Sequence, residues 1–213
     1  MREVWLSVAL LALQLPLQPG AAPAPQTSPN THRQLLERLS QAAVARTLLA
    51  VRYDPAYVKI PYPNGDVPAD TGVCTDEVIR SYRALGIDLQ KVVHEDMQKN
   101  LLAYASHGRW RMSRTDTNID HRRVPNLQVF FSRNGESLTV TSRAEDYLPG
   151  ELVTWDLGGG VPHIGILVNQ KSAETGRYMV EHNIGAGPKV EDVLFAWKIT
   201  GHYRYFGPSA NSK

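Results

Sequence analysis

The sequence predicts an α+β domain in which N-terminal helices pack on an antiparallel sheet. Apolar residues recur at helical spacing up to about residue 135, whereas short apolar runs separated by glycine-rich or polar turns follow from residue 138. A chain with helices first and strands afterwards is typical of the α+β class. The chain has 213 residues, and removing a leader of 24 leaves 189, which is enough for one domain with its own core.

The first 24 residues have the layout of a secretory signal peptide. Arg2 precedes an apolar run from Val4 to Leu17, and small residues and prolines follow the run. The run is shorter than the roughly 20 residues that a membrane-spanning helix needs. We therefore expect cleavage near Gly20–Ala24 and no integral membrane segment afterwards. No cysteine lies near that point, which excludes a lipid-modified lipoprotein. The expected location is secreted or periplasmic, in the cell envelope.

The rest of the chain divides into one folded domain and two short ends. Residues 21–30 are rich in proline, alanine and serine, and we expect a disordered tether over residues 25–33. Residues 34–207 are expected to form the domain, and residues 208–213 a tail. The formal net charge is only +2, with acidic and basic residues interspersed, so nucleic acid is not an expected partner.

Four helices are expected before residue 136. The first, over Gln34–Tyr53, is rich in alanine and leucine at helical spacing. In the second, the apolar residues from Val78 to Leu85 recur on one helix face, and Gly86 is a natural stop. The third, over Asp88–Ala105, repeats the amphipathic pattern; its His94 is expected to be a satisfied core or surface histidine. The fourth is short, begins at Pro125 and ends at Gly135.

The strands are expected to follow in an antiparallel sheet. Each is a short apolar run between turn-forming residues. The expected strands lie around Leu138–Thr141, Leu152–Trp155, Ile164–Val168, Tyr178–His182 and Phe195–Phe206, the last with Gly201 as a point of interruption.

Cys74 is the only cysteine in the chain, so no internal disulfide can form. In an exported protein it is a buried hydrophobe, an intermolecular link or a reactive thiol, and burial is common for free cysteine. It lies in or just before the first turn of the second helix, where unpaired N–H groups and the helix dipole favour a thiolate. Asp76 and Glu77 oppose that charge, so a reactive Cys74 needs a base from elsewhere.

His163 and His182 are the two histidines whose context fits that need. His163 opens the apolar run HIGILVN, His182 closes the run YMVEHNIG, and the polar segment NQKSAETGR between them is typical of a hairpin loop. One hairpin register places the two imidazoles directly opposite each other, with Cβ atoms about 5 Å apart. A slip of one residue places Asn183 opposite His163 instead. Either partner can orient an imidazole, which completes the arrangement that nucleophilic catalysis needs.

These motifs resemble the NlpC-type cell-wall cysteine peptidases of the papain-like superfamily. The similar features are Cys74 at a helix start, the segment PGELVTW, the segment HIGIL and a polar residue on the following strand. More closely, GVCTDEVIRSYRALGIDLQKVVHEDM, DTNIDHRRVPNLQVFFSRNG and EHNIGAGPKVEDVLFAWKITGHYRY resemble an exported bacterial group, domain-of-unknown-function family 1287. The sequence V-C-T-D stands where the peptidases usually have D-C-S-G, so their substrate and oxyanion contacts are not carried over.

The resemblance implies a papain-like fold and an exported thiol hydrolase, an amidase or endopeptidase. It makes Cys74 the nucleophile, His163 the base and His182 the orienting residue, with a cell-wall peptide as the substrate. Two other functions are open: a wall-binding module whose thiol site no longer turns over, and an acyltransferase that uses the same site.

Four charged residues are candidates for substrate binding. Arg122 and Arg123, in the segment DTNIDHRRVPN, could grip a carboxylate bidentately; a solvated cluster or a structural ion-pair network is the alternative. Asp70 and Asp76, beside Cys74, could recognise an amine, although turn formation and helix capping are the stronger interpretation. Cys74, His163 and His182 could also supply three zinc ligands, but no short paired spacing supports a metal site. No metal or cofactor is expected.

Overall fold

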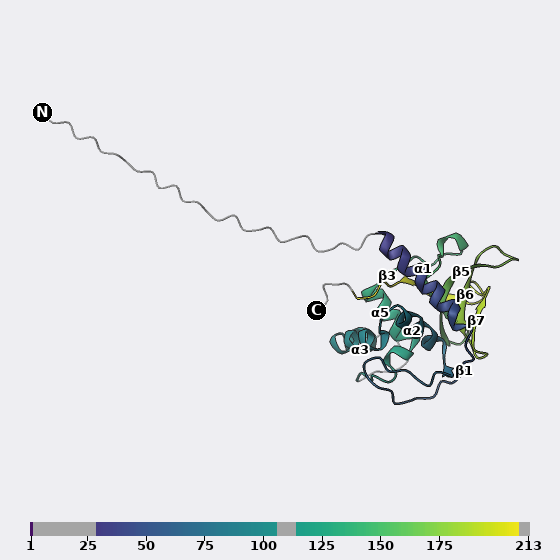
Figure 1. The fold of residues 1–213 in the computed structure, drawn as a ribbon, viewed down its shortest axis with the longest axis horizontal. Coiled ribbons are helices and arrows are strands. Elements are labelled where there is room, and N and C mark those ends of the chain that lie inside the picture. The colour runs from purple at the N-terminus through teal and green to yellow at the C-terminus, as the bar shows by residue number, and fades with distance from the viewer. Residues whose placement is uncertain (2–28, 106–113, 209–213) are drawn as a thin grey trace.

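The computed structural model describes Met1, residues 29–105 and residues 114–208 (Figure 1). Residues 2–24 of the expected signal peptide therefore lie outside the described residues, as do residues 25–28 of the expected tether and residues 209–213 of the expected tail. Helix α1 spans Pro29–Arg46 and so begins inside the segment expected to be tether. Among the described helices, none is long and apolar enough to cross a membrane.

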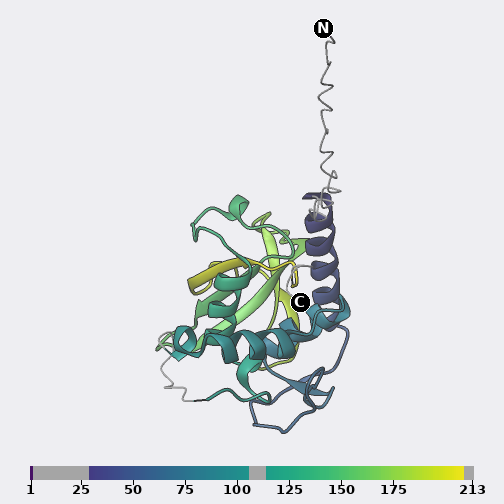
Figure 2. The same ribbon diagram turned by 90° about the vertical axis from the view of Figure 1, so that its left-hand side faces the viewer.

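The domain has a layer of helices packed on an antiparallel sheet, which confirms the expected α+β class (Figures 1 and 2). Figure 1 shows α1 lying beside strands β5 and β7. The sheet has the strand order β3-β8-β4-β5-β6-β7. The further helices are α2 (Cys74–Ala84), α3 (Leu89–Lys99), α4 (Leu101–Ala105) and α5 (Val124–Asn134), with the 3-10 turns η1 (Asp120–Arg122) and η2 (Ala144–Asp146). The sheet strands are β3 (Glu136–Ser137), β4 (Leu152–Asp156), β5 (Pro162–Lys171), β6 (Tyr178–Asn183), β7 (Pro188–Glu191) and β8 (Lys198–Arg204).

The first helix ends earlier than the sequence predicts. It stops at Arg46, and the chain continues to strand β1 (Arg52–Tyr53), which pairs in parallel with β2 (Thr71–Gly72). This pairing fixes an extended backbone at residues expected to be helical. The long helix expected over Asp88–Ala105 is divided into α3 and α4 at Asn100, whose ψ of 33° departs from helical geometry. Helices α2 and α5 match their expected positions closely.

The strands also differ from the expectation in places. The strand expected around Leu138–Thr141 is shorter and lies at Glu136–Ser137, and the sequence analysis does not predict β7. The interruption expected at Gly201 appears as a register shift. Gly201 pairs with Thr154, whereas Trp155 pairs with Ile199, so Thr200 is left between the paired residues.

The hairpin of β5 and β6 has a register that neither expected alignment gives. Ile166 pairs with Glu181 and Leu167 with Val180. This register is shifted by two residues from direct pairing of His163 with His182, and by one from pairing with Asn183. Because side chains alternate between faces, a shift of two keeps both histidines on one face as diagonal neighbours.

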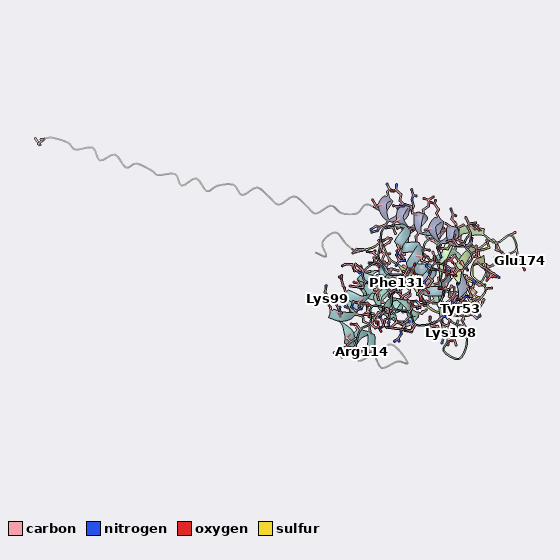
Figure 3. All side chains as sticks on the ribbon, turned by 60° about the horizontal axis from the view of Figure 1, so that its bottom comes forward. Tyr53, Lys99, Arg114, Phe131, Glu174 and Lys198 are labelled. Carbon is pink, nitrogen blue, oxygen red and sulfur yellow. The ribbon has the colours of Figure 1, made fainter. Side chains whose placement is uncertain are left out.

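Apolar side chains cover both faces of the sheet. The larger core lies between the sheet and the helices, and Figure 3 shows one of its members, Phe131, within the molecule. Buried residues of this core include Val78, Tyr82, Leu127, Phe130, Phe131, Ile164, Ile166 and Tyr205. A smaller core on the other face contains Tyr147, Val153, Trp155, Leu167, Val180 and Leu194. His163 lies near the start of β5, which, like β4, contributes to both cores.

Candidate active site

Cys74 is the first residue of helix α2, as the sequence predicts. The residue before it, Val73, is extended (φ −124°, ψ −178°), and its backbone N–H donates to Asp76 Oδ2 at 2.7 Å. The carboxylate of Asp76 therefore caps the start of the helix, which is the structural alternative that the sequence favoured. This cap fixes the point at which the loop turns into α2.

The loop before Cys74 is held by Arg80, which lies further along α2. Arg80 Nη2 donates to the carbonyl oxygens of Thr71, Pro68 and Val67 at 2.9, 3.2 and 3.3 Å. A Cβ atom on Gly72 would lie 3.0 Å from Arg80 Nη1, so a glycine lets the guanidinium approach the loop. One buried arginine thus positions the segment that presents the cysteine.

The Cys74 sulfur lies against strand β5, beside the residue that follows His163. The backbone N–H of Ile164 is directed at the sulfur, as are those of Thr75 and Cys74 itself. These hydrogen bonds lower the pKa of the Cys74 thiol, but burial has the larger effect and raises it to about 12. The negative charge of the Asp76 carboxylate adds to the increase. The residue is 6% exposed. The sulfur is therefore a neutral thiol near pH 7.

His163 and His182 are in direct contact. His163 Nε2 lies 2.9 Å from His182 Nδ1, and the two rings are nearly perpendicular. The indoles of Trp155 and Trp197 lie 5.8 and 6.0 Å from the His163 ring, between ring centres. Burial, and then the neighbouring His182, lower the pKa of His163 to about 3. Both the cysteine and this histidine are thus neutral in the resting protein.

His182 has a second partner that the sequence analysis missed. Its Nε2 lies 2.9 Å from Oε2 of Glu191, the last residue of β7. Glu191 pairs with Val180, which shares a face with His182. The segment NIGAGPKVE contains the glycines of a hairpin turn followed by a short extended run, and this signal could have predicted β7. Asn183, the other expected orienting residue, points to the opposite face, where its Oδ1 accepts from the backbone N–H of Gly185.

A cleft of about 420 Å³ opens beside Cys74. Its lining is mostly apolar, and Cys74 and Pro162 bring α2 and the start of β5 to one edge of it. The lining residues are Tyr53, Pro55, Val73, Cys74, Thr75, Tyr104, Ile119, Arg122, Arg123, Val124, Pro125, Asn126 and Pro162. The cysteine therefore lies at the wall of a space large enough for part of a peptide.

The four candidate substrate-binding residues occupy different environments. Arg122 Nε and Nη2 donate to the two carboxylate oxygens of Asp76 at 2.8 and 3.0 Å, and both side chains are buried. Arg122 Nη1 donates to the carbonyl oxygen of Ala56. These contacts give Asp76 and Arg122 a structural role, because substrate binding would require this buried pair to open. Asp70 is exposed and is not among the cleft-lining residues, whereas the half-buried Arg123 does line the cleft.

Among residues 29–105 and 114–208, no three His, Cys, Asp or Glu side chains are grouped so that they could hold a metal ion. His94 is buried and its Nδ1 lies 2.9 Å from Asp120 Oδ2, which confirms it as a satisfied core histidine.

Two solved structures show weak similarity to this chain. NlpC2 from Trichomonas vaginalis has a TM-score of 0.43 and 17% sequence identity, and the match covers 80% of this chain and 46% of that chain. An N-acetylmuramoyl-L-alanine amidase from Bacteroides uniformis ATCC 8492 has a TM-score of 0.46 and 12% identity, over 80% of this chain and 98% of that one.

Sequence comparisons give a closer relationship. The uncharacterized protein YijF of Escherichia coli (strain K12) is 45% identical over 203 residues, which are 94% of this chain and 98% of that protein. The family model described as domain of unknown function (DUF1287) matches residues 40–205. The match includes the cysteine, both histidines and Glu191, and the chain belongs to the DUF1287 family.

Proposed function

We propose that the protein is an exported cysteine hydrolase that cleaves an amide or peptide bond in the peptide part of peptidoglycan. One observation carries the proposal: the Cys74 sulfur lies at the backbone of Ile164, next to His163, and His163 is hydrogen bonded to His182. Cys74 lies at the wall of the cleft, and we infer that His163, whose chain neighbour Ile164 reaches the sulfur, serves as its base with His182 as the orienting residue.

In the proposed reaction the Cys74 sulfur attacks the carbonyl carbon of the substrate. His163 accepts the thiol proton as the new carbon–sulfur bond forms, because both groups are neutral beforehand. His163 then gives the proton to the leaving nitrogen as the carbon–nitrogen bond breaks. This leaves a thioester on Cys74, which water attacks with His163 again acting as the base. Hydrolysis of the thioester returns the free thiol and releases a carboxylic acid.

The negative charge that develops on the carbonyl oxygen needs donors near the sulfur. Cys74 and Thr75 begin helix α2, and the backbone N–H groups of a first helical turn have no partners within the helix. Both N–H groups point at the sulfur. We assign them to the oxyanion contact, where the positive end of the helix dipole adds to their effect.

The substrate class depends on the expected export and on the resemblance to cell-wall peptidases. The cleft adds one chemical constraint, since Arg123 contributes a guanidinium to a mostly apolar lining. No side-chain partner is found for Arg123 among the described residues. A peptide that carries a free carboxylate, as cell-wall peptides do, fits this combination.

The test uses purified sacculi and the full mature chain. Wild-type protein should release muropeptides, whereas Cys74→Ala, Cys74→Ser and His163→Ala should release none above the rate without protein. Mass spectrometry of the products identifies the bond that is cut. If wild type and Cys74→Ala release the same products at the same rate, Cys74 is not the nucleophile. Binding to sacculi with no product from any form would favour the wall-binding module.

The apolar lining of the cleft also favours a second candidate, acyl transfer from the same thioester to an amine. The first half of the reaction is then unchanged, and an amine replaces water in the second half. Product analysis with an added amine separates the two functions, because transfer gives a new amide and hydrolysis gives a carboxylic acid.

A further inference from the structure

Three side chains form an unbroken hydrogen-bonded chain that ends at a carboxylate. His163 Nε2 contacts His182 Nδ1, and His182 Nε2 contacts Glu191 Oε2, both at 2.9 Å. The carboxylate lies on β7, the edge strand next to β6 in the sheet. Its side chain is 41% exposed, whereas the His182 side chain is 1% exposed.

The direction of the hydrogen bonds follows from the last member of the chain. A carboxylate can only accept, so His182 Nε2 must carry a proton and donate it to Glu191. Burial keeps the pKa of His182 below its ordinary value even though Glu191 opposes the shift, so the ring is neutral and its Nδ1 is an acceptor. His163 Nε2 must then carry the proton of the bond between the two rings.

This order determines the tautomer of His163. With the proton on Nε2, the remaining ring nitrogen, Nδ1, has a free lone pair that can accept a proton. Without the carboxylate, His182 could carry its proton on Nδ1 and donate it to His163. His163 would then be protonated on Nδ1 and would have no lone pair to accept the thiol proton of Cys74.

We propose that Glu191 is a positioning residue that sets the tautomer of His163 through His182, as the fourth member of the site. Its second effect is electrostatic: when His163 takes up the thiol proton, the carboxylate at the end of the chain stabilises the imidazolium. The inference rests on the proposed function for its chemical meaning, but the tautomer itself is a property of the folded protein.

The test compares Glu191→Ala, Glu191→Gln and a control variant, Glu174→Ala, with wild type. Glu174 is exposed in the turn between β5 and β6 (Figure 3), so its replacement removes the same charge at a position that is not a member of the chain of hydrogen bonds. The first readout is the ¹⁵N spectrum of histidine-labelled protein, in which protonated and unprotonated ring nitrogens give separate signals. It requires no substrate.

We expect wild type, Glu191→Gln and Glu174→Ala to have His163 protonated on Nε2, because the glutamine amide oxygen still accepts from His182. Glu191→Ala should shift the proton to Nδ1 in part or in full. A Glu191→Ala protein that keeps the wild-type tautomer would overturn the proposal, and so would a Glu191→Gln protein as altered as Glu191→Ala.

The second readout is the rate at which iodoacetamide alkylates Cys74 between pH 6 and 9. We expect Glu191→Ala to react about tenfold to a hundredfold more slowly near pH 7, with a smaller decrease in Glu191→Gln, as found when a group that orients a histidine is removed. Equal rates for Glu191→Ala and Glu174→Ala would contradict the proposal. The wild-type protein could release nothing from sacculi while Glu191→Ala still shifts the proton of His163 to Nδ1. In that case the proposed function is wrong, but the role of Glu191 in setting the tautomer is confirmed.

Discussion

At the residue scale, burial keeps both Cys74 and His163 neutral near pH 7. Burial raises the pKa of Cys74 to about 12 and lowers that of His163 to about 3. A resting thiolate–imidazolium pair is therefore disfavoured, and in the proposed reaction the proton moves only as the sulfur attacks. Low polarity around the two groups also strengthens the hydrogen bonds that meet the developing charges. A buried, neutral thiol has little thiolate character, so we expect Cys74 to oxidise slowly.

The buried histidines predict how stability depends on pH. Burial, followed by the Arg122 charge, lowers the pKa of His121 from its ordinary 6.5 to about 4. The lowered pKa means that the fold favours the neutral ring, so the stabilisation is complete above pH 6.5 and is lost as the pH falls toward 4. Between pH 7 and pH 5 the free energy of unfolding should decrease in both proteins. We expect this decrease to be about 2 kcal/mol smaller in His121→Asn than in wild type, at 1.36 kcal/mol for each pKa unit.

Urea denaturation at the two pH values measures this difference. His163→Asn should also reduce the pH dependence, because its pKa is lowered in the same direction. A His121→Asn protein with the same pH dependence as wild type would show that His121 is already protonated, or solvated, in the fold.

At the scale of the elements, the site depends on how α2 is joined to its neighbours. Its first turn is tied to η1 by the buried pair of Asp76 and Arg122, and Arg80, in the second turn, ties the helix to the preceding loop. Its C-terminal half packs into the larger core through Val78, Ile79 and Tyr82. Polar contacts thus fix the end of the helix that carries the cysteine, while apolar contacts fix the rest.

The pair of Asp76 and Arg122 gives a prediction at this scale. Asp76→Ala or Arg122→Met alone leaves a buried charge unpaired, which should lower the free energy of unfolding by about 3–5 kcal/mol. In the double variant, the free energy of unfolding should decrease by clearly less than the sum of the decreases in the two single variants. Urea denaturation of the four proteins gives the coupling energy. Additive losses would mean that the two side chains do not stabilise each other.

At the scale of the whole molecule, α1 closes the domain by lying against the sheet. Leu39 and Ala43 are fully buried, and Ser40 Oγ accepts from the backbone N–H of Asn169 at 2.8 Å. Gly150, before β4, has a φ of +85°, and a Cβ atom there would lie 2.2 Å from the carbonyl oxygen of Leu36. The sheet and the first helix can approach this closely only because residue 150 has no side chain.

Gly150→Ala should therefore displace α1, whereas Gly176→Ala is a matched control. Gly176 also has a positive φ, +73°, but no atom lies within 4 Å of the position that a Cβ atom would take there. In both variants, backbone strain should lower the free energy of unfolding by about 1 kcal/mol. In Gly150→Ala, the collision with α1 should lower the free energy of unfolding by about 2 kcal/mol more. Thermal unfolding of both proteins measures the difference, and equal losses would show that α1 adjusts without cost.

Local patterns in the sequence determined the fold class, the position of α2, the cysteine at its start and the two histidines on adjacent strands. These features follow from helical and strand periodicity and from turn residues, which depend on near neighbours in the chain. The periodicity left two registers open, and only the observed pairing, an even shift from direct opposition, puts His163 and His182 on one face. The catalytic roles of these residues stay a prediction.

Only the tertiary structure decided the register of the hairpin, the strand that brings Glu191 to His182 and the partner of Arg122. Asp76 and Arg122 lie 46 positions apart, and no local pattern relates a buried carboxylate to a distant guanidinium. The long helix expected over Asp88–Ala105 was wrong for the same reason, because its break at Asn100 is not encoded in the apolar spacing. Pairing between distant segments is selected by the packing of the complete core, and this packing is what converts a buried cysteine and two histidines into one candidate site.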